Sequence, residues 1–279
     1  MKKYFIAVIL VAIFLSLISC APTLRLLSKS ILIDNTHNNE NNYDNYAKEV
    51  FFGTLISELE SMYHTVDFTS EVGFSPSQYD ILILDAPFTT YTYSEGDKVK
   101  SFLRNGGTLV ALGEKAAGYW NNTYLNDMLS YLGVDIRFES NIIYDYTNYY
   151  EEYFWPKIID FENHPTTNSL TSIVLFAACT LDVFGSAEVV AESSTVNVIE
   201  AFSPQEENNI SSSAISKESL TNPQVSITVP IIGVDYVDSG KVIAIPDVTL
   251  FGDDVYNSID KDYIEVHDNM QLLMNIIYW

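Results

Sequence analysis

Three short apolar runs in the first half of the chain, each followed by a segment with helical periodicity, constrain its fold most strongly. They are SILID at residues 30–34, YDILILDAP at 79–87 and TLVALG at 108–113. Strands that are apolar on both sides are typical of a parallel sheet covered on both faces. Because strands and helices alternate, we expect right-handed βαβ crossovers and a doubly wound, mostly parallel α/β sheet of flavodoxin-like type.

Apolar periodicity and end signals mark the connecting helices. Residues 43–62 are predicted to form the first helix, with one apolar stripe made of Ala47, Phe51, Leu55, Leu59 and Met62. Ser94 and Asp97 have the spacing of a capping box for a second helix, which Asn105, Gly106 and Gly107 end. A third helix is predicted to begin at Asn122 or Thr123 and to stop at Gly133.

The second half of the chain is richer in strand patterns. The predicted strands are VDIRF (134–138), SIVLFAACTLDV (172–183), AEVVAES (187–193), QVSITVPIIGVDYV (224–237) and KVIAIPDVTLF (241–251), and Asp238-Ser239-Gly240 forms a hairpin turn between the last two. Residues 203–224 are rich in Ser and Asn and are interpreted as a polar surface insertion. We therefore expect one domain, residues 30–279, in which a β-rich elaboration follows the α/β half.

The N-terminus has the pattern of a targeting segment. Two lysines precede an apolar run at residues 4–15, and the stretch closes with LSLISC, which ends at Cys20. The run is short for a membrane span, and the ending resembles the lipobox of bacterial lipoproteins. The resemblance implies that residues 1–19 are cleaved, that Cys20 is acylated and that residues 20–29 form a short tether. An ordinary secretory signal or a single transmembrane anchor is the alternative.

Charge and cysteine content exclude several functions. The formal net charge is −23, so a nucleic-acid partner is not expected, because binding phosphates requires a basic face. Acylation of Cys20 would leave Cys179 as the sole free thiol, with no partner for an intramolecular disulfide. Cys179 lies in an apolar run and is predicted to be a small buried residue and not a catalytic thiol.

Polar side chains follow three of the predicted strands and form the first candidate site. Asp34, Thr36 and His37 follow the first strand, Glu114 follows TLVALG, and Asp247 follows KVIAI. In a parallel sheet these strand ends share one edge, where carboxylates and a histidine could hold a divalent cation or a polar ligand. The identity of any metal stays open, and no organic cofactor is expected. The alternative is that Asp34 and Asp247 cap turns while His37 is merely exposed.

The second candidate site is an aromatic segment, YDYTNYYEEYFWP, at residues 144–156. Its candidate binding residues are Tyr144, Tyr146, Tyr149, Tyr150, Tyr153 and Trp155. Rings that combine an apolar face with a polar tip suit sugar stacking or a protein interface. The alternative is a flap that covers the edge of the sheet.

Several stretches together resemble the class I glutamine amidotransferase-like superfamily. They are SILIDNTHNN, YDILILDAPFTTYTYSEGDKVKSFLRNGGTLVALGE, NNTYLNDMLSYLGVDIRFESNIIYD, NHPTTNSL and GKVIAIPDVTLFGDD, with DNMQLLMNIIYW at the end. The most similar branch holds the GIFT domain of intraflagellar transport proteins and bacterial envelope domains of unknown function. Catalytic members carry a cysteine at a strand–turn–helix elbow and a downstream histidine and glutamate. Here the turn from Gly113 to Gly118 holds neither cysteine nor serine, which implies a non-catalytic relative that serves in binding or assembly.

These observations predict a lipoprotein of the bacterial cell envelope, anchored to a membrane and facing away from the cytoplasm. Its amidotransferase-like domain is predicted to be a binding or assembly module for a carbohydrate or protein partner. One alternative is a glycan-directed envelope hydrolase that uses Asp34, His37, Glu114 and Asp247. Another is a solute-binding lipoprotein of a transporter. The sequence leaves open the partner, the oligomeric state, the membrane and its leaflet, and any residual activity.

Overall fold

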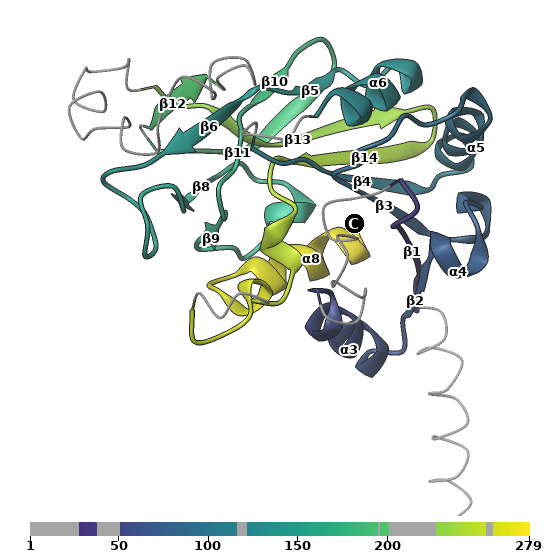
Figure 1. Cartoon of the computed structure of the whole chain (residues 1–279), viewed down its shortest axis with the longest axis horizontal. Helices are drawn as coiled ribbons and strands as arrows, with labels where there is room; N and C mark the ends of the chain where they lie inside the picture. Colours follow the sequence, from purple (N-terminus) through teal and green to yellow (C-terminus); the bar gives the residue numbers. More distant parts are fainter. Residues whose placement is uncertain (1–27, 38–50, 116–121, 195, 201–226, 255–258) are drawn as a thin grey trace, which may run out of the picture.

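An eight-stranded sheet with strand order β2-β1-β3-β4-β14-β13-β11-β8 forms the centre of the molecule (Figure 1). The computed structural model describes residues 28–37, 51–115, 122–194, 196–200, 227–254 and 259–279. Five strands are parallel: β1 (Ser30–Asp34), β2 (Thr65–Phe68), β3 (Ile81–Asp85), β4 (Thr108–Leu112) and β14 (Gly240–Ile245). The antiparallel extension is formed by β13 (Pro230–Val237), β11 (Glu188–Glu192) and β8 (Asp160–Phe161). The predicted mostly parallel α/β sheet with a β-rich second half is confirmed.

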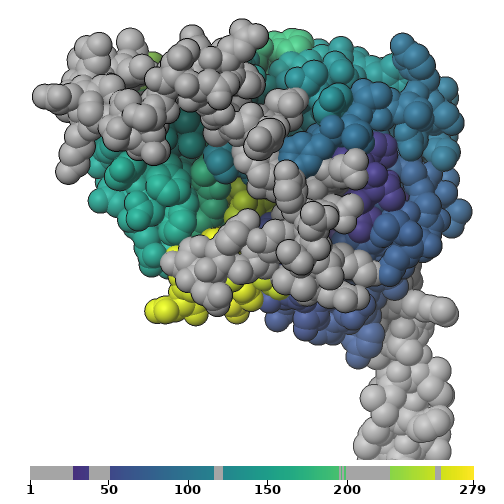
Figure 2. All heavy atoms as spheres, in the orientation of Figure 1, coloured from purple at the N-terminus to yellow at the C-terminus, as the bar shows by residue number. Residues whose placement is uncertain are grey.

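Two hydrophobic cores cover the two faces of this sheet. Helices α5 (Tyr93–Arg104) and α6 (Thr123–Leu132) pack on one face, and α3 (Gly53–Ser61) and α8 (Asn269–Tyr278) pack on the other (Figure 1). Space-filling atoms of α3 (dark blue) and α8 (yellow) lie along the same side of the molecule (Figure 2). Successive residues of β1, β3, β4 and β14 alternate between the two cores, which explains why these strands are unbroken apolar runs.

The helix boundaries differ in part from those predicted. The expected first helix is described from Phe51 onward, so Ala47 of its stripe lies outside the described residues, and Met62 is 38% exposed beyond the end of α3. Helix α5 is capped by Thr92, whose hydroxyl accepts a hydrogen bond from the Glu95 backbone while the Glu95 carboxylate accepts one from the Thr92 backbone. The predicted Ser94–Asp97 cap was therefore wrong by two residues.

Helix α6 begins and ends where the sequence indicates. It starts at Thr123 after Asn122, and Gly133 ends it in the left-handed conformation with φ 79°. Asn122 occupies the N-cap position without capping the helix, because its side chain is bonded elsewhere.

The run SIVLFAACTLDV was predicted as one strand, and this was wrong. It contains β9 (Ile173–Val174), which pairs with β7 (Lys157–Ile158), and β10 (Leu181–Val183), which pairs with β5 (Ile136–Phe138). The residues between them are buried, but their backbone groups bond to other loops: Ala177 N donates to Phe154 O and Cys179 N donates to Pro246 O.

Short elements complete the described structure. Strand β6 (Asn141–Tyr144) pairs with β12 (Asn197–Glu200), and the short helices are α4 (Thr69–Val72), η2 (Pro76–Gln78), η3 (Pro165–Thr167), η5 (Thr249–Phe251) and η6 (Tyr263–Glu265). The expected signal peptide, Cys20 and the insertion at 203–224 lie outside the described residues. Within the described part of the chain, no helix has the length and apolarity needed to cross a membrane.

The strand order creates a topological switch point between β1 and β3. The chain leaves β1 through α3 toward β2 on one side, and it leaves β3 through α5 toward β4 on the other side. In open α/β sheets, ligands bind in the crevice beyond the carboxyl ends of the strands at such a point. The segments after β1 and β3 therefore define where a site is to be sought.

Candidate functional site

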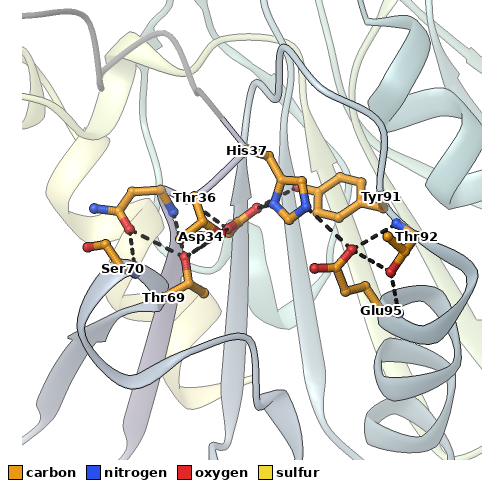
Figure 3. A network of polar contacts seen from close by, with 9 residues as sticks. Asp34, Thr36, His37, Thr69, Ser70, Tyr91, Thr92 and Glu95 are labelled. Carbon is orange, nitrogen blue, oxygen red and sulfur yellow. Dashed lines mark hydrogen bonds and ion pairs between the residues drawn. The ribbon is translucent and has the colours of Figure 1, made fainter.

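The carboxylate of Asp34, at the end of β1, is the centre of a buried polar network (Figure 3). Its Oδ2 accepts hydrogen bonds from His37 Nδ1 at 2.7 Å and from the Tyr91 hydroxyl at 2.8 Å. Its Oδ1 accepts from the Thr36 backbone at 3.2 Å, the Thr36 hydroxyl at 2.9 Å and the Thr69 hydroxyl at 2.8 Å. Asp34 thus joins the loops that follow β1, β2 and β3.

His37 lies between two carboxylates. It is 7% exposed, its Nδ1 contacts Asp34, and its Nε2 lies 3.5 Å from Glu95 Oε2. The Tyr91 ring packs against it with centroids 3.9 Å apart, and Phe74 meets it edge-on. Burial alone would lower the pKa of His37, but the hydrogen bonds and charges of Asp34 and Glu95 raise it. The alternative that His37 is merely exposed is wrong.

The ionisation of Asp34 fits this arrangement. Burial acts to raise its pKa, but the hydrogen bond and charge of His37, with the hydroxyls of Tyr91 and Thr69, hold the pKa below its usual value. An ionised Asp34 and a charged His37 therefore stabilise each other. The Asx turn from Asp34 to Thr36 also agrees with the predicted capping role of this carboxylate.

Glu114 follows β4 and belongs to a second buried cluster. Its Oε1 accepts hydrogen bonds from the backbone and the ammonium of Lys115, both at 3.0 Å. Its Oε2 is buried and has no hydrogen-bond partner among the described residues. Asn122 holds the Glu114 backbone, because its Oδ1 accepts from Glu114 N at 3.0 Å and its Nδ2 donates to Glu114 O at 2.8 Å. Glu114 is therefore a firmly held acid, one oxygen of which has no partner in the part of the chain that the structure describes. Residues 116–118 of the predicted elbow turn lie outside the described residues.

Asp247 follows β14, the strand next to β4, and is fully buried. Its Oδ1 accepts from Thr249 N at 2.8 Å, and its Oδ2 accepts from Phe176 N. Burial and the negative charge of Glu114 raise the pKa of Asp247 to about 7, against the opposing effect of these two amides. Asp247 fastens two loops, and its oxygens point at backbone amides.

The structure therefore divides the predicted crevice into two clusters. Strands β3 and β4 separate β1 from β14, which corresponds to roughly 14 Å at the usual spacing between neighbouring strands. Asp34, Thr36 and His37 lie together at the switch point, and Glu114 and Asp247 lie together at the elbow. Among the described residues, no three His, Cys, Asp or Glu side chains are placed to hold a metal ion.

Part of the aromatic segment covers the core and part of it is exposed. Tyr150 and Trp155 pack against the larger hydrophobic core. Tyr146, Tyr149 and Tyr153 are each about 40% exposed. Tyr150 and Trp155 thus suit the predicted covering flap, and the three exposed tyrosines suit the predicted binding surface.

Tyr144, Tyr146 and Tyr153 form a three-tyrosine cluster. The rings of Tyr144 and Tyr146 are stacked with centroids 6.3 Å apart, and Tyr153 lies 6.0 Å from the first and 5.3 Å from the second. Burial and the neighbouring Tyr153 raise the pKa of Tyr144, while the charge of Lys115 lowers it. Lys115 is therefore within electrostatic range of Tyr144, which connects the cluster with the elbow.

Cys179 is the thiol in this region, and it does not have the surroundings of a nucleophile. It is fully buried, and burial together with the charge of Glu114 raises its pKa far above the ordinary value. The Asn122 amide contacts its sulfur at 3.5 Å. The prediction that Cys179 is a buried, unreactive residue agrees with this position.

Sequence reasoning missed Thr69, Tyr91 and Glu95 in the Asp34 network. Thr69 follows a strand that the sequence pattern did not reveal. Tyr91 and Glu95 lie directly after YDILILDAP and at the start of α5. Since polar residues after buried strands at a switch point are candidates for a site, this position was the signal available for Tyr91 and Glu95.

Comparisons with known proteins identify the fold. No protein-family model matches the chain, and no curated protein matches its sequence. The mmIFT52 N-terminal domain superposes with a TM-score of 0.61 at 14% identity, over 89% of this chain and 96% of that one. A ThuA-like protein from Bacteroides uniformis ATCC 8492 matches at 18% identity over 90% of this chain and 89% of its own, with a TM-score of 0.48.

A third match is the β-galactosidase from Bacillus circulans sp. alkalophilus, at 11% identity and a TM-score of 0.47. It covers 90% of this chain and 30% of the galactosidase. At these identities the likeness extends to the fold alone. The chain thus shares the fold of the mmIFT52 domain, in line with the predicted GIFT-like resemblance.

Proposed function

We propose that this chain is a lipid-anchored envelope protein whose α/β domain is a binding and assembly module. Its ligand contacts the three-tyrosine cluster and Glu114 at the elbow. The observation that carries this proposal is Glu114, a buried acid with one oxygen that has no partner among the described residues. Its partner Lys115 lies within electrostatic range of Tyr144 in the three-tyrosine cluster. The turn offers an acceptor and a charge for binding, and it carries no cysteine or serine for covalent catalysis.

The chemistry of the elbow suits a carbohydrate or a protein partner. Tyrosine rings bury a large apolar face at low cost in side-chain entropy, and their hydroxyls stay wet at the rim of an interface. A hydroxyl or an amide N–H of the ligand would donate to Glu114 Oε2 and satisfy it. Such a contact is specific, because a ligand without a donor would leave the buried oxygen unpaired.

The alternative of a glycan hydrolase requires two carboxyl groups that flank the scissile bond. Asp247 has the raised pKa that suits a general acid, but both of its oxygens already accept hydrogen bonds from backbone amides. Asp34 is likewise enclosed by protein partners. The geometry therefore supports the binding role better.

The anchor is tested with the variant Cys20→Ser. Acylation of this cysteine would hold the chain on a membrane, so the variant should move to the soluble fraction and lose labelling with a radioactive fatty acid. Cys179→Ser is the matched control, because the same substitution at the buried cysteine leaves the anchor in place. Membrane association that persists in Cys20→Ser would contradict the anchor but would leave the binding role untouched.

The binding role is tested with Tyr146→Ser combined with Tyr153→Ser. Deletion of the whole segment would expose the core under Tyr150 and Trp155, so point variants of the exposed rings are preferable. Tyr63→Asn is the control, since Tyr63 is 69% exposed and has a φ of 67° that asparagine tolerates. Cross-linking and affinity capture from envelopes, with and without competing envelope sugars, should show a partner that the double variant loses and the control retains. Equal capture by both would contradict the proposal.

A further inference from the structure

A separate pocket lies between the N-terminal half of α5 and helix α6. Its volume is about 330 Å³, and its walls include four tyrosines (Tyr91, Tyr93, Tyr124 and Tyr131), Asp127 and Met128. The loop from β3 into α5 supplies Tyr91, so the pocket adjoins the topological switch point. Its size falls in the range of small-molecule sites, and it adjoins the edge of the sheet at which this class of fold binds ligands.

Hydrogen bonds to carboxylates hold two of the four rings in place. The Tyr91 hydroxyl donates to Asp34 at 2.8 Å, and the Tyr131 hydroxyl donates to Asp97 at 2.6 Å. The Tyr93 and Tyr131 rings meet at 53° with centroids 6.0 Å apart, so they form a corner of the wall. A phenol that donates to a carboxylate gains electron density in its ring, which strengthens the negative potential on the ring face.

The absence of a side chain at Gly96 leaves space for the Tyr131 ring, which forms part of the pocket wall. A glycine inside a helix is unfavourable relative to alanine, so its presence in α5 needs a reason. A Cβ atom at Gly96 would lie 2.7 Å from Cε1 of Tyr131, which is closer than a real contact allows. The glycine therefore lets the Tyr131 ring lie directly against α5.

The charges around the pocket favour a cation. Asp127 supplies a carboxylate in the wall, and Asp97 lies behind Tyr131. The lining contains no Lys, Arg or His among the described residues. The Lys98 ammonium donates a hydrogen bond to the Phe74 carbonyl at 2.9 Å. The Lys100 ammonium lies over the Tyr131 ring, 5.6 Å from its centroid, which is the geometry of a cation–π contact.

We infer that this pocket binds a small organic ammonium cation, held by the tyrosine faces and by Asp127. Aromatic faces attract ammonium groups through their quadrupole, and the attraction is stronger for methylated ammonium, which has weak hydration to lose. An acidic side chain in the wall completes the recognition. The inference rests on neither the elbow nor the lipid anchor, so it is independent of the function proposed above.

The test is a titration of the full chain with choline chloride, followed by calorimetry and by tyrosine fluorescence. The neutral isostere 3,3-dimethyl-1-butanol has the same shape without the charge. We expect choline to bind and the isostere to bind at least roughly tenfold more weakly. Asp127→Asn should weaken choline binding by roughly tenfold and should narrow the difference between the two ligands.

Gly96→Ala and Tyr93→Ala should also weaken choline binding, the first by displacing Tyr131 and the second by removing one wall. Tyr93 is 82% exposed, so its loss leaves the fold intact even if Gly96→Ala destabilises it. The controls are Asp160→Asn, an exposed acid on β8, and Tyr146→Ser in the three-tyrosine cluster; both should bind choline as the parent chain does.

Three results would overturn the inference. Equal binding of the isostere would show an apolar pocket, and binding of a neutral sugar without choline would show a carbohydrate site. Binding to phosphatidylcholine vesicles without binding of dissolved choline would place the cation on a lipid surface and not in this pocket. Loss of partner capture in the Tyr146 and Tyr153 variants would test the binding role proposed for Glu114 and the three-tyrosine cluster. It would neither support nor contradict binding of a cation in this pocket.

Discussion

The hydroxyl of Tyr91 donates a 2.8 Å hydrogen bond to Asp34, and 57 residues of chain separate the two. This bond fastens the segment after β3 to the end of β1 across the switch point. Because Tyr91 also lines the tyrosine pocket, the polar network at the sheet edge and the wall of the pocket are one structural unit. The stability that this unit contributes, and the protonation of Asp34 and His37 within it, can be measured.

The difference in stability between the parent chain and His37→Gln should depend on pH in a defined direction. The folded pKa of His37 is raised above 6.5, so its stabilisation is fully present below pH 6.5 and is lost as the pH rises through the folded pKa. At pH 5.5 the free energy of unfolding of the parent chain should be about 1.5–3 kcal/mol higher than that of His37→Gln. At pH 9 the difference between the two should be smaller. Urea unfolding between pH 5.5 and 9 measures this.

His64→Gln is the matched control, because burial and the charge of Lys29 lower the pKa of His64. Its contribution has the opposite sign: it is present above pH 6.5 and is lost as the pH falls below 6.5 and through the lower folded pKa. A difference for His37→Gln that grows with pH would contradict the ion pair.

Replacing Glu114 with glutamine should lower the pKa of Asp247. Burial and the like charge of Glu114 raise this pKa to about 7 from 3.8, so the stability that Asp247 contributes is fully present below pH 3.8 and is lost by about pH 7. Without the Glu114 charge, the titration midpoint of the Asp247 carboxyl in a carbon NMR experiment should move to lower pH. Glu139→Gln, an exposed acid that follows β5, should leave the midpoint unchanged. An unchanged midpoint in Glu114→Gln would show that the two acids are not coupled.

An alanine at Gly113 should destabilise the chain because of a neighbouring ring. Gly113 directly follows β4, and its backbone is not among those with positive φ, so a left-handed conformation does not require a glycine there. A Cβ at this position would instead lie 2.3 Å from Cδ1 of Phe138. Gly113→Ala should cost about 1–3 kcal/mol in free energy of unfolding, and less in a Phe138→Leu background. The same cost in both backgrounds would exclude the ring as the cause.

Cys179 should resist thiol reagents in the folded chain. In the Cys20→Ser variant it is the sole remaining cysteine, so labelling reports on it alone. Since the thiol is fully buried and its pKa is raised, reaction with a disulfide reagent at pH 8 should be on the order of a hundredfold slower than in guanidinium chloride. Fast labelling of the folded variant would mean that this region opens readily.

Burial was easier to predict from the sequence than conformation. Strands β1, β3 and β4 are unbroken apolar runs because both faces of the sheet are covered, and the sequence locates them well. Strand β2 was missed, because its four residues include Asp67 and only Phe68 is buried. The run around Cys179 is apolar because it lies in the core, yet most of it is irregular, since apolarity reports burial and not hydrogen bonding.

The candidate site was predictable only in part for a related reason. Asp34 and Glu114 follow recognisable strands, so their place at the sheet edge follows from the fold. The contacts of Asp34 with Tyr91 and Thr69 depend on the strand order β2-β1-β3. Knowing which segments are strands does not determine the order of those strands in the sheet. Likewise, the pocket depends on how α6 packs beside α5, which the sequence does not determine. The sequence around Gly96 also does not indicate that the Tyr131 ring packs against this glycine.

The position of β14 has a consequence for how the chain is made. This strand lies between β4 and β13, where Lys241 pairs with Thr108, so the middle of the sheet is completed by a segment that the ribosome makes long after β4. Until then β4 has an unpaired edge of the kind that recruits other chains, and pairing over such a sequence distance is slow. A chain truncated before Gly240 therefore lacks a central strand of the sheet. The edge of β4 then stays unpaired, so the truncated chain should be prone to aggregate.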